Sequence, residues 1–185
     1  MLNKIFQETE EEMKKALLEL EQEFNTIRTG RATPSLIDNV MVEAYGARSP
    51  IKQIASVSIP DARTIVIQPW DKGTLGAIEK ALLAANLGFT PNNDGRMIRI
   101  NLPTLTEDRR KEFVKLAKRM AEDARISVRN IRRKHKEEVK KLEKDRQIGE
   151  DEMYADIDKI QELTDKYIKK VDERLEKKEK EIMEV

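Results

Sequence analysis

The residues with the clearest capacity for chemistry are the basic side chains between positions 124 and 136. This stretch holds six Arg or Lys residues and no carboxylate, because the nearest acids are Asp123 and Glu137. Four of the six are arginines, whose planar guanidinium group donates paired hydrogen bonds to phosphate oxygens. On a helix, at about 100° per residue, five of these six side chains share about a third of the circumference with Lys140. The residues of this basic face are Arg125, Arg129, Arg132, Arg133, Lys136 and Lys140.

The basic face predicts binding to structured RNA through several phosphates at once. It contains no Phe, Tyr or Trp, so recognition of single strands by base stacking is not indicated. The competing interpretation is a solvated helix surface. The enrichment in arginine and the missing acids favour the RNA interpretation.

Side chains that could form an active site or a metal site are few. The chain has no cysteine, and its single histidine is His135. A metal site would need further His or Cys ligands, so we interpret His135 as a packing or surface residue. Gly73 and Gly76 flank a helix start without a phosphate-binding loop, and Ser127 has no base beside it. We therefore expect no catalytic residue, no metal and no cofactor. An enzyme would instead require a strongly perturbed ionisable group in a pocket.

The composition limits the kind of protein this is. The formal net charge is +1, which excludes a general polycation, so affinity for nucleic acid must come from local charge. The absence of cysteine fits a reducing compartment. No segment has the length and apolar character of a signal peptide or a membrane span. These features predict a soluble, cytoplasmic protein that makes no membrane contact. The charged fraction of 38% is compatible with a heat-adapted source.

Three amphipathic helices are predicted to position the basic face. Apolar residues recur every three or four positions over 2–27, 106–146 and 151–184. The middle helix, roughly 40 residues long, would reach about 60 Å and must pack against partners. Thr104 and Glu107 form a capping-box pattern at its start, and Gly149 interrupts the pattern after it. The simplest arrangement is an antiparallel three-helix bundle built from both ends of the chain.

A less charged region lies between these helices. Residues 31–103 contain 14 charged residues in 73, against 57 in the other 112. Alternating apolar residues predict strands over 38–44, 54–59 and 64–68. A helix is expected over 75–86, with Thr74 at its N-cap. A hairpin is expected over 89–101. The region therefore reads as a small inserted β/α/β domain.

The fold class that follows is α+β, with two domains. Residues 1–30 and 104–185 form the antiparallel three-helix bundle, and residues 31–103 form the inserted β/α/β domain. Because the two linkers lie side by side, the insert could pivot as a body and give a bent shape. The predicted hinge residues are Thr29, Gly30, Leu102 and Pro103.

Several short segments of the sequence form a specific combination: 28–32 with Pro34, 62–64, 69–72, 91–95 and 129–133. On these segments the sequence resembles the ribosome recycling factor family over essentially its whole length. Departures from the family pattern are Phe89 and Thr90 before Pro91, and Asn101; they fall in the insert and leave the basic face intact.

The resemblance implies an L-shaped translation factor with an outline like that of tRNA. Such a factor binds the large ribosomal subunit after termination. With elongation factor G and GTP, it splits the ribosome so that mRNA and tRNA leave. By resemblance, Arg129 and Arg132 are the main contacts to large-subunit rRNA, with Arg28, Arg31 and Arg133 in support. The insert and linkers would be the part that elongation factor G moves, and the factor, expected to be a monomer, would hydrolyse nothing itself.

One alternative remains open on the residues alone. A helical scaffold or coiled-coil adaptor would carry the same charges merely to stay soluble. The two hypotheses differ in their response to salt, because phosphate contacts release counterions and apolar contacts do not.

Overall fold

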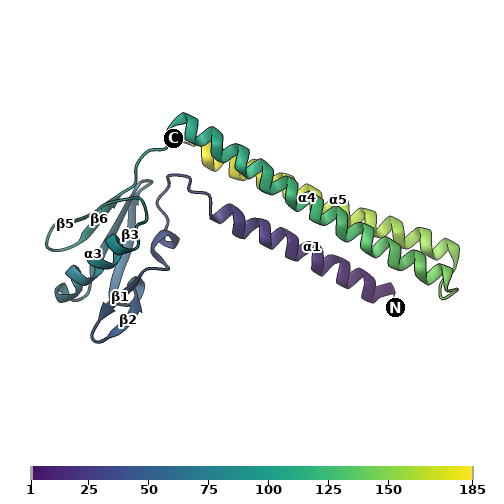
Figure 1. Cartoon of the computed structure of the whole chain (residues 1–185), viewed down its shortest axis with the longest axis horizontal. Helices are drawn as coiled ribbons and strands as arrows, with labels where there is room; N and C mark the ends of the chain where they lie inside the picture. Colours follow the sequence, from purple (N-terminus) through teal and green to yellow (C-terminus); the bar gives the residue numbers. More distant parts are fainter. Residues whose placement is uncertain (1, 185) are drawn as a thin grey trace. The chain divides into compact units, whose positions relative to one another are not determined.

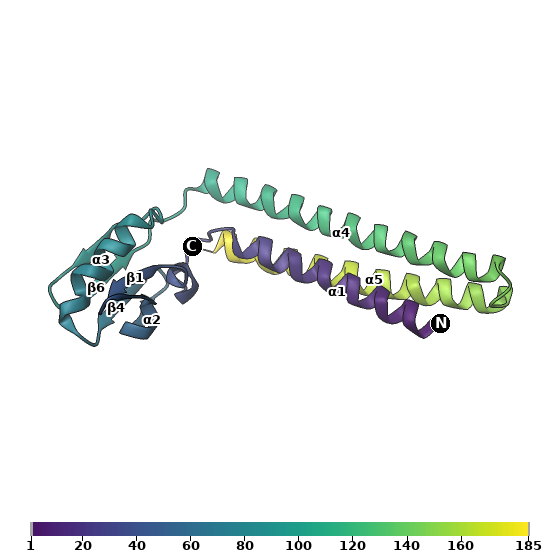
Figure 2. The same ribbon diagram turned by 60° about the horizontal axis from the view of Figure 1, so that its bottom comes forward.

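The structure, a computed structural model, describes residues 2–184. The chain divides into two compact units (Figures 1 and 2). The helical unit is made of two parts of the chain, the residues up to Thr29 and those from Thr106 onward. The sheet unit is Gly30–Leu105 between them. The predicted domain boundaries, after residues 30 and 103, lie one and two residues from these positions.

The helical unit consists of three long helices. They are α1 (Leu2–Asn25), α4 (Glu107–Lys144) and α5 (Glu150–Met183). α4 runs antiparallel to both α1 and α5 (Figures 1 and 2), so the predicted antiparallel three-helix bundle is confirmed. Small residues on the buried side of α4 let the neighbouring helices approach closely. These small residues are Ala117, Ala121 and Ala124, which pack in one cluster with Leu20, Phe24 and Val171.

The start of α4 differs from the predicted capping box. Thr106, not Thr104, is the N-cap, and its side chain accepts a hydrogen bond from the Arg109 amide at 3.2 Å. Thr104 Oγ1 instead accepts a hydrogen bond from the Arg63 guanidinium at 2.5 Å. The Thr104–Glu107 pattern indicated the wrong N-cap because Thr104 and Thr106 are both followed closely by Glu107 and Asp108. Helix α4 therefore begins two residues later than the capping box predicts.

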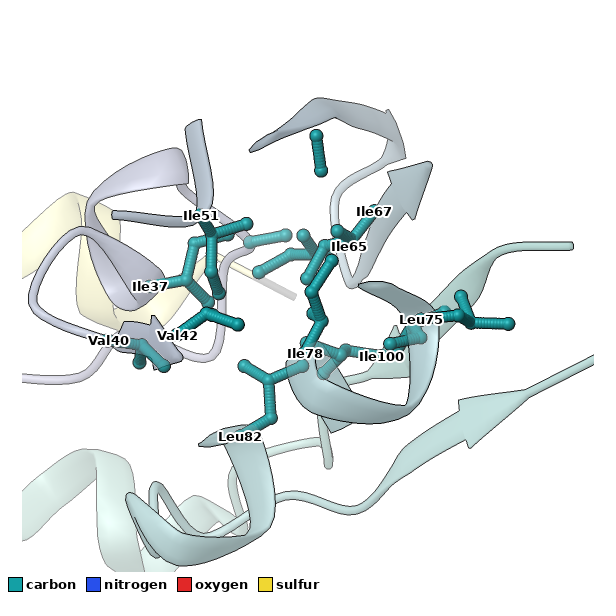
Figure 3. Close-up of a cluster of buried hydrophobic side chains, with 13 residues drawn as sticks. Ile37, Val40, Val42, Ile51, Ile65, Ile67, Leu75, Ile78, Leu82 and Ile100 are labelled. Atoms are coloured by element: carbon teal, nitrogen blue, oxygen red, sulfur yellow. The ribbon is translucent and has the colours of Figure 1, made fainter. Parts of the chain in front are cut away.

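The sheet unit is built on a four-stranded antiparallel sheet. Its strands are β3 (Ala55–Asp61), β4 (Thr64–Pro69), β5 (Pro91–Asn93) and β6 (Ile98–Asn101), in the order β3-β4-β6-β5. Alternate residues of β4 and β6 point to one face, where they meet helix α3 (Leu75–Ala84). Figure 3 shows Ile65, Ile67 and Ile100 gathered with Ile78 and Leu82 of this helix. This cluster is the core of the unit.

The remaining elements of the sheet unit were only partly predicted. Strand β1 (Met41–Ala44) lies inside the predicted 38–44, but it pairs with an unpredicted strand β2 (Ala47–Pro50). The short elements η1 (Pro34–Ile37), α2 (Ile51–Ile54) and η2 (Lys72–Thr74) were also not predicted. Thr74 is the N-cap of α3 as expected, but its hydroxyl donates to the Asp71 carbonyl oxygen at 2.7 Å instead of capping the helix.

Candidate nucleic-acid interface

The basic face lies on α4 next to the side that packs in the bundle. The buried side of the helix includes Ala124, Val128, His135 and Val139. The basic residues between these positions are half-buried or exposed. One helix therefore brings together Arg125, Arg129, Arg132, Arg133 and Lys136, all of which are predicted to bind rRNA.

Arg125 is engaged within the bundle. Its Nε and one terminal nitrogen donate to Asp172 Oδ1 of α5 at 2.8 and 2.6 Å, and the other terminal nitrogen donates to Glu122 Oε2 at 3.0 Å. Only 19% of the Arg125 side chain is exposed. Its guanidinium group therefore connects α4 to α5, and little of its hydrogen-bonding capacity faces solvent.

Arg129 is more exposed but shares a carboxylate with Arg125. Its guanidinium donates to Glu122 Oε1 at 3.3 Å, and 38% of its side chain is exposed. The hydrogen bond from Arg125, with the charges of both arginines, lowers the pKa of the Glu122 carboxyl. Glu122 thus remains negative at the start of the basic face and offsets part of its charge.

Arg132 and Arg133 differ from both. Their side chains have no ion-pair or hydrogen-bond partner among residues 2–184. One turn further on, Lys136 Nζ donates to the neutral amide oxygen of Gln161 at 3.4 Å. The segment from Arg132 to Lys136 therefore carries positive charge on this face that no carboxylate offsets, whereas Lys140 pairs with Glu137 at 3.0 Å.

His135 and Lys134 belong to the junction between α4 and α1. Lys134 Nζ donates to Glu12 Oε1 at 2.7 Å. The fully buried His135 ring has Nε2 3.4 Å from the same oxygen and Nδ1 3.3 Å from Glu138 Oε2. In the described part of the chain, no group of three or more His, Cys, Asp or Glu side chains is placed to hold a metal ion.

The other predicted site residues lie near the boundary between the units. Arg28 and Arg31 follow α1, one on each side of that boundary. Leu102 belongs to the sheet unit, because its amide donates to the Arg63 carbonyl oxygen at 2.8 Å. Gly30 has a φ of 76°, a conformation that glycine adopts without strain.

Sequence reasoning missed the acids that partner the basic face. Glu122 lies just before the carboxylate-free stretch, three residues from Arg125, so helical spacing would have indicated this pair. Asp172 is 47 residues from Arg125, and no local pattern predicts that contact. None of the helices in the described residues has the length and apolar character needed to cross a membrane.

Comparisons with known proteins match both units of the chain to the same family. A family model described as ribosome recycling factor matches residues 20–183. A ribosome-recycling factor of Oleidesulfovibrio alaskensis is 54% identical over 184 residues, which cover all of both chains. The solution structure of a ribosome recycling factor has a TM-score of 0.78 and 44% identity, and the match covers 100% of this chain and 98% of that one. A model of the T. thermophilus ribosome recycling factor, bound with E. coli elongation factor G to the E. coli post-termination complex, has a TM-score of 0.64 and 44% identity, with full coverage of both chains.

Proposed function

The chain belongs to the ribosome recycling factor family, and on this premise we propose that it binds the ribosome after termination and splits it into subunits. Elongation factor G and GTP act with it, so that mRNA and tRNA are released and the ribosome is recycled. The relative from T. thermophilus, which is placed on a post-termination complex together with elongation factor G, supports this proposal.

The basic face of α4 is proposed to contact the RNA of the large ribosomal subunit. The supporting observation is that Arg132 and Arg133 have no carboxylate partner among the described residues. An unpaired arginine can meet phosphate without first breaking an ion pair, so most of its interaction energy is available for binding. Arg132, Arg133 and Lys136 are therefore the strongest contacts in this proposal.

The other basic residues are proposed to contribute less to RNA binding. Arg129 would contact RNA after releasing Glu122, which reduces its net contribution. Arg125 would act mainly by holding α4 against α5. Arg28 and Arg31 would support the contact from the segment after α1.

The chain itself is proposed to catalyse no reaction and to need no cofactor, with GTP hydrolysis belonging to the partner. The three helices bury their apolar stripes against each other within one chain, so the proposal requires no second copy. A monomer acting in the cytoplasm, where ribosomes work, is consistent with it.

Equilibrium binding to isolated large ribosomal subunits across a salt series tests the RNA contact. We expect a slope of log affinity against log salt of roughly −3 to −5 for the wild type, from about four to six phosphate contacts. Arg132→Ala should weaken binding by about 1–3 kcal/mol and make the slope shallower by about one, while its fold remains intact.

A matched control is Lys177→Ala, which removes an exposed positive charge from α5. This variant should bind like the wild type. Salt-insensitive binding by the wild type, or equal losses in both variants, would favour the scaffold hypothesis over an RNA site on α4.

A further inference from the structure

The loop between β5 and β6 contains a chemically labile pair of residues. Asp94 and Gly95 form the only Asp-Gly sequence in the chain, which has no Asn-Gly sequence. Such a pair can rearrange because glycine has no Cβ to hinder its backbone nitrogen as it approaches the preceding carboxyl group. Both residues are exposed, and among the described residues no atom lies within 4 Å of the place that a Gly95 Cβ would take. Packing therefore does not shield this bond.

The rearrangement is an intramolecular condensation. The Gly95 nitrogen loses its proton and bonds to Asp94 Cγ, and the hydroxyl group of the carboxylic acid leaves as water. The product is a five-membered succinimide ring. Water then opens this ring at one of its two carbonyl carbons. Opening at Cγ restores aspartate, whereas opening at the backbone carbonyl carbon leaves isoaspartate, whose main chain runs through Cβ and Cγ. The reaction needs water and no second reactant.

The nitrogen that would attack is held by a side chain of the same loop. The Gly95 amide donates to Asn93 Oδ1 at 2.8 Å. At its other end, the Asn93 side-chain nitrogen donates to Glu79 Oε2 of α3 at 2.9 Å. The orientation of the Asn93 amide group is therefore fixed by the helix. Because the Gly95 nitrogen must give up its proton to react, the hydrogen bond to Asn93 has to break first.

The carboxyl group that would be attacked is held as well. Asp94 Oδ1 accepts hydrogen bonds from the amides of Met97 at 2.8 Å and Arg96 at 2.9 Å. These two bonds, with smaller contributions from the charges of Arg99 and Arg96, lower the pKa of Asp94. A carboxylate is a poor electrophile, because its negative charge is shared between both oxygens. The protonated form that reacts is therefore scarce in the folded chain at neutral pH.

We propose that Asp94 is a site of spontaneous isoaspartate formation, and that the Asn93 side chain slows the reaction by holding the Gly95 amide. Isoaspartate would add a methylene group to the backbone of the loop that leads into β6. Two residues of this strand, Ile98 and Ile100, are fully buried in the core of the sheet unit. The modification would therefore disturb the pairing that places them. This inference does not depend on the proposed function.

The isoaspartate content of the full chain tests the proposal. Wild type, Asn93→Ala and Asn93→Ser are incubated at neutral pH and physiological temperature, and circular dichroism checks that each is folded. An isoaspartate-specific carboxyl methyltransferase with labelled S-adenosylmethionine measures the product, and mapping of the tryptic peptide that ends at Arg96 assigns it to Asp94. Wild type unfolded in guanidinium chloride gives the rate without the folded loop.

A matched control is Asn92→Ala. Asn92 is exposed in the same hairpin, and its side chain has no hydrogen-bond partner among residues 2–184. This variant should form isoaspartate at the wild-type rate. It separates the loss of the hydrogen bond to Gly95 from the general effect of replacing an asparagine in β5.

Asn93→Ala should form isoaspartate at Asp94 about fivefold faster than the wild type, a factor that corresponds to about 1 kcal/mol for one lost hydrogen bond. Asn93→Ser should lie between the two, because its hydroxyl is a weaker acceptor. The unfolded wild type should react faster than every folded variant. Equal rates for folded wild type and Asn93→Ala, or no isoaspartate at Asp94 in the unfolded chain, would overturn the proposal. If Asn93→Ala failed to fold, a wild-type rate in Asn93→Ser would overturn it.

Discussion

Arg125 and Arg132 lie seven residues apart on the same face of α4, yet their guanidinium groups have different surroundings. Arg125 donates three hydrogen bonds to two carboxylates, whereas Arg132 has no side-chain partner in residues 2–184. A positive side chain that is already paired mainly stabilises the fold. One without a partner adds little to the fold and is available for a ligand.

Arg125→Ala should therefore act on stability more than on binding. Removing the guanidinium leaves Asp172 without its partner on α4, and we expect the free energy of unfolding to fall by about 1–3 kcal/mol. Urea unfolding of this variant measures the change, and Arg133→Ala, as the control, should stay within about 0.5 kcal/mol of the wild type. The salt slope of large-subunit binding should remain near the wild-type value for Arg125→Ala, and a large change in that slope would instead make Arg125 an RNA contact.

At the residue scale, the sequence predicted which face of the helix carries the basic residues. It did not predict which of their charges are offset by carboxylates. Helical spacing alone put Arg125, Arg129, Arg132 and Arg133 on one face. Whether the charge of Arg125 is offset depends largely on Asp172, which reaches the face through tertiary packing of α5. Contacts between helices cannot be read from the spacing of residues within one helix.

At the scale of elements, Glu12 connects α1 to α4. It accepts the hydrogen bond from Lys134 and faces the buried ring of His135. The hydrogen bond from Lys134, with smaller contributions from the charges of His135 and Lys134, lowers the pKa of Glu12 below its usual 4.5. A carboxyl group whose pKa is lower in the folded state stabilises the fold above its unfolded pKa, and this contribution is lost as the pH falls through the folded pKa.

Glu12→Gln should consequently be less stable than the wild type at pH 7, and the difference should shrink as the pH falls below 4.5. Unfolding in urea at a series of pH values between 7 and 3 measures this. Glu11→Gln is the control, because Glu11 is exposed on the same helix and has no ion pair in the described residues. A difference that stayed constant with pH would show that Glu12 acts through packing and not through its charge.

The elements themselves were predicted where periodicity is strong. Three helices with apolar residues at every third and fourth position were expected near their observed bounds, as were β4, α3 and the hairpin of β5 and β6. Strand β2 was missed because Ala47–Pro50 contains no β-branched or aromatic residue, and its turn uses Tyr45 where Asn is usual. Pairing with β1 makes this segment a strand, and its own composition does not.

At the scale of the whole molecule, only two segments join the units, at Thr29–Gly30 and at Leu105–Thr106. Gly30 combines a φ of 76° with a close neighbour, since a Cβ there would lie 3.4 Å from Leu105 Cγ of the other segment. The positive φ would strain any other residue in one connection, and its Cβ would lie in van der Waals contact with Leu105 of the second. If the sheet unit pivots during splitting, as the resemblance implies, its freedom depends on this glycine.

Gly30→Ala should slow splitting without weakening large-subunit binding. The left-handed conformation costs a residue with a Cβ about 1–2 kcal/mol, and the new methyl group restricts motion against Leu105. Gly149→Ala is the control, because Gly149 has an ordinary φ of −80° and open space where a Cβ would lie. Normal splitting by Gly30→Ala, measured by light scattering, would argue against a pivot at this position.

The discontinuous helical unit also constrains how the protein is made. The Tyr167 hydroxyl donates to Glu10 across a separation of 157 residues, while the contacts of the sheet unit fall within 30–105. During translation the sheet unit can complete its core before α4 and α5 exist, but α1 must wait until nearly the whole chain has been synthesised. Helix α1 leaves the exit tunnel before α4 and α5 and is therefore among the last helices of this chain to find its partners. Its apolar stripe is exposed to chaperones and to aggregation throughout synthesis, so biogenesis as well as final stability limits the substitutions that α1 tolerates.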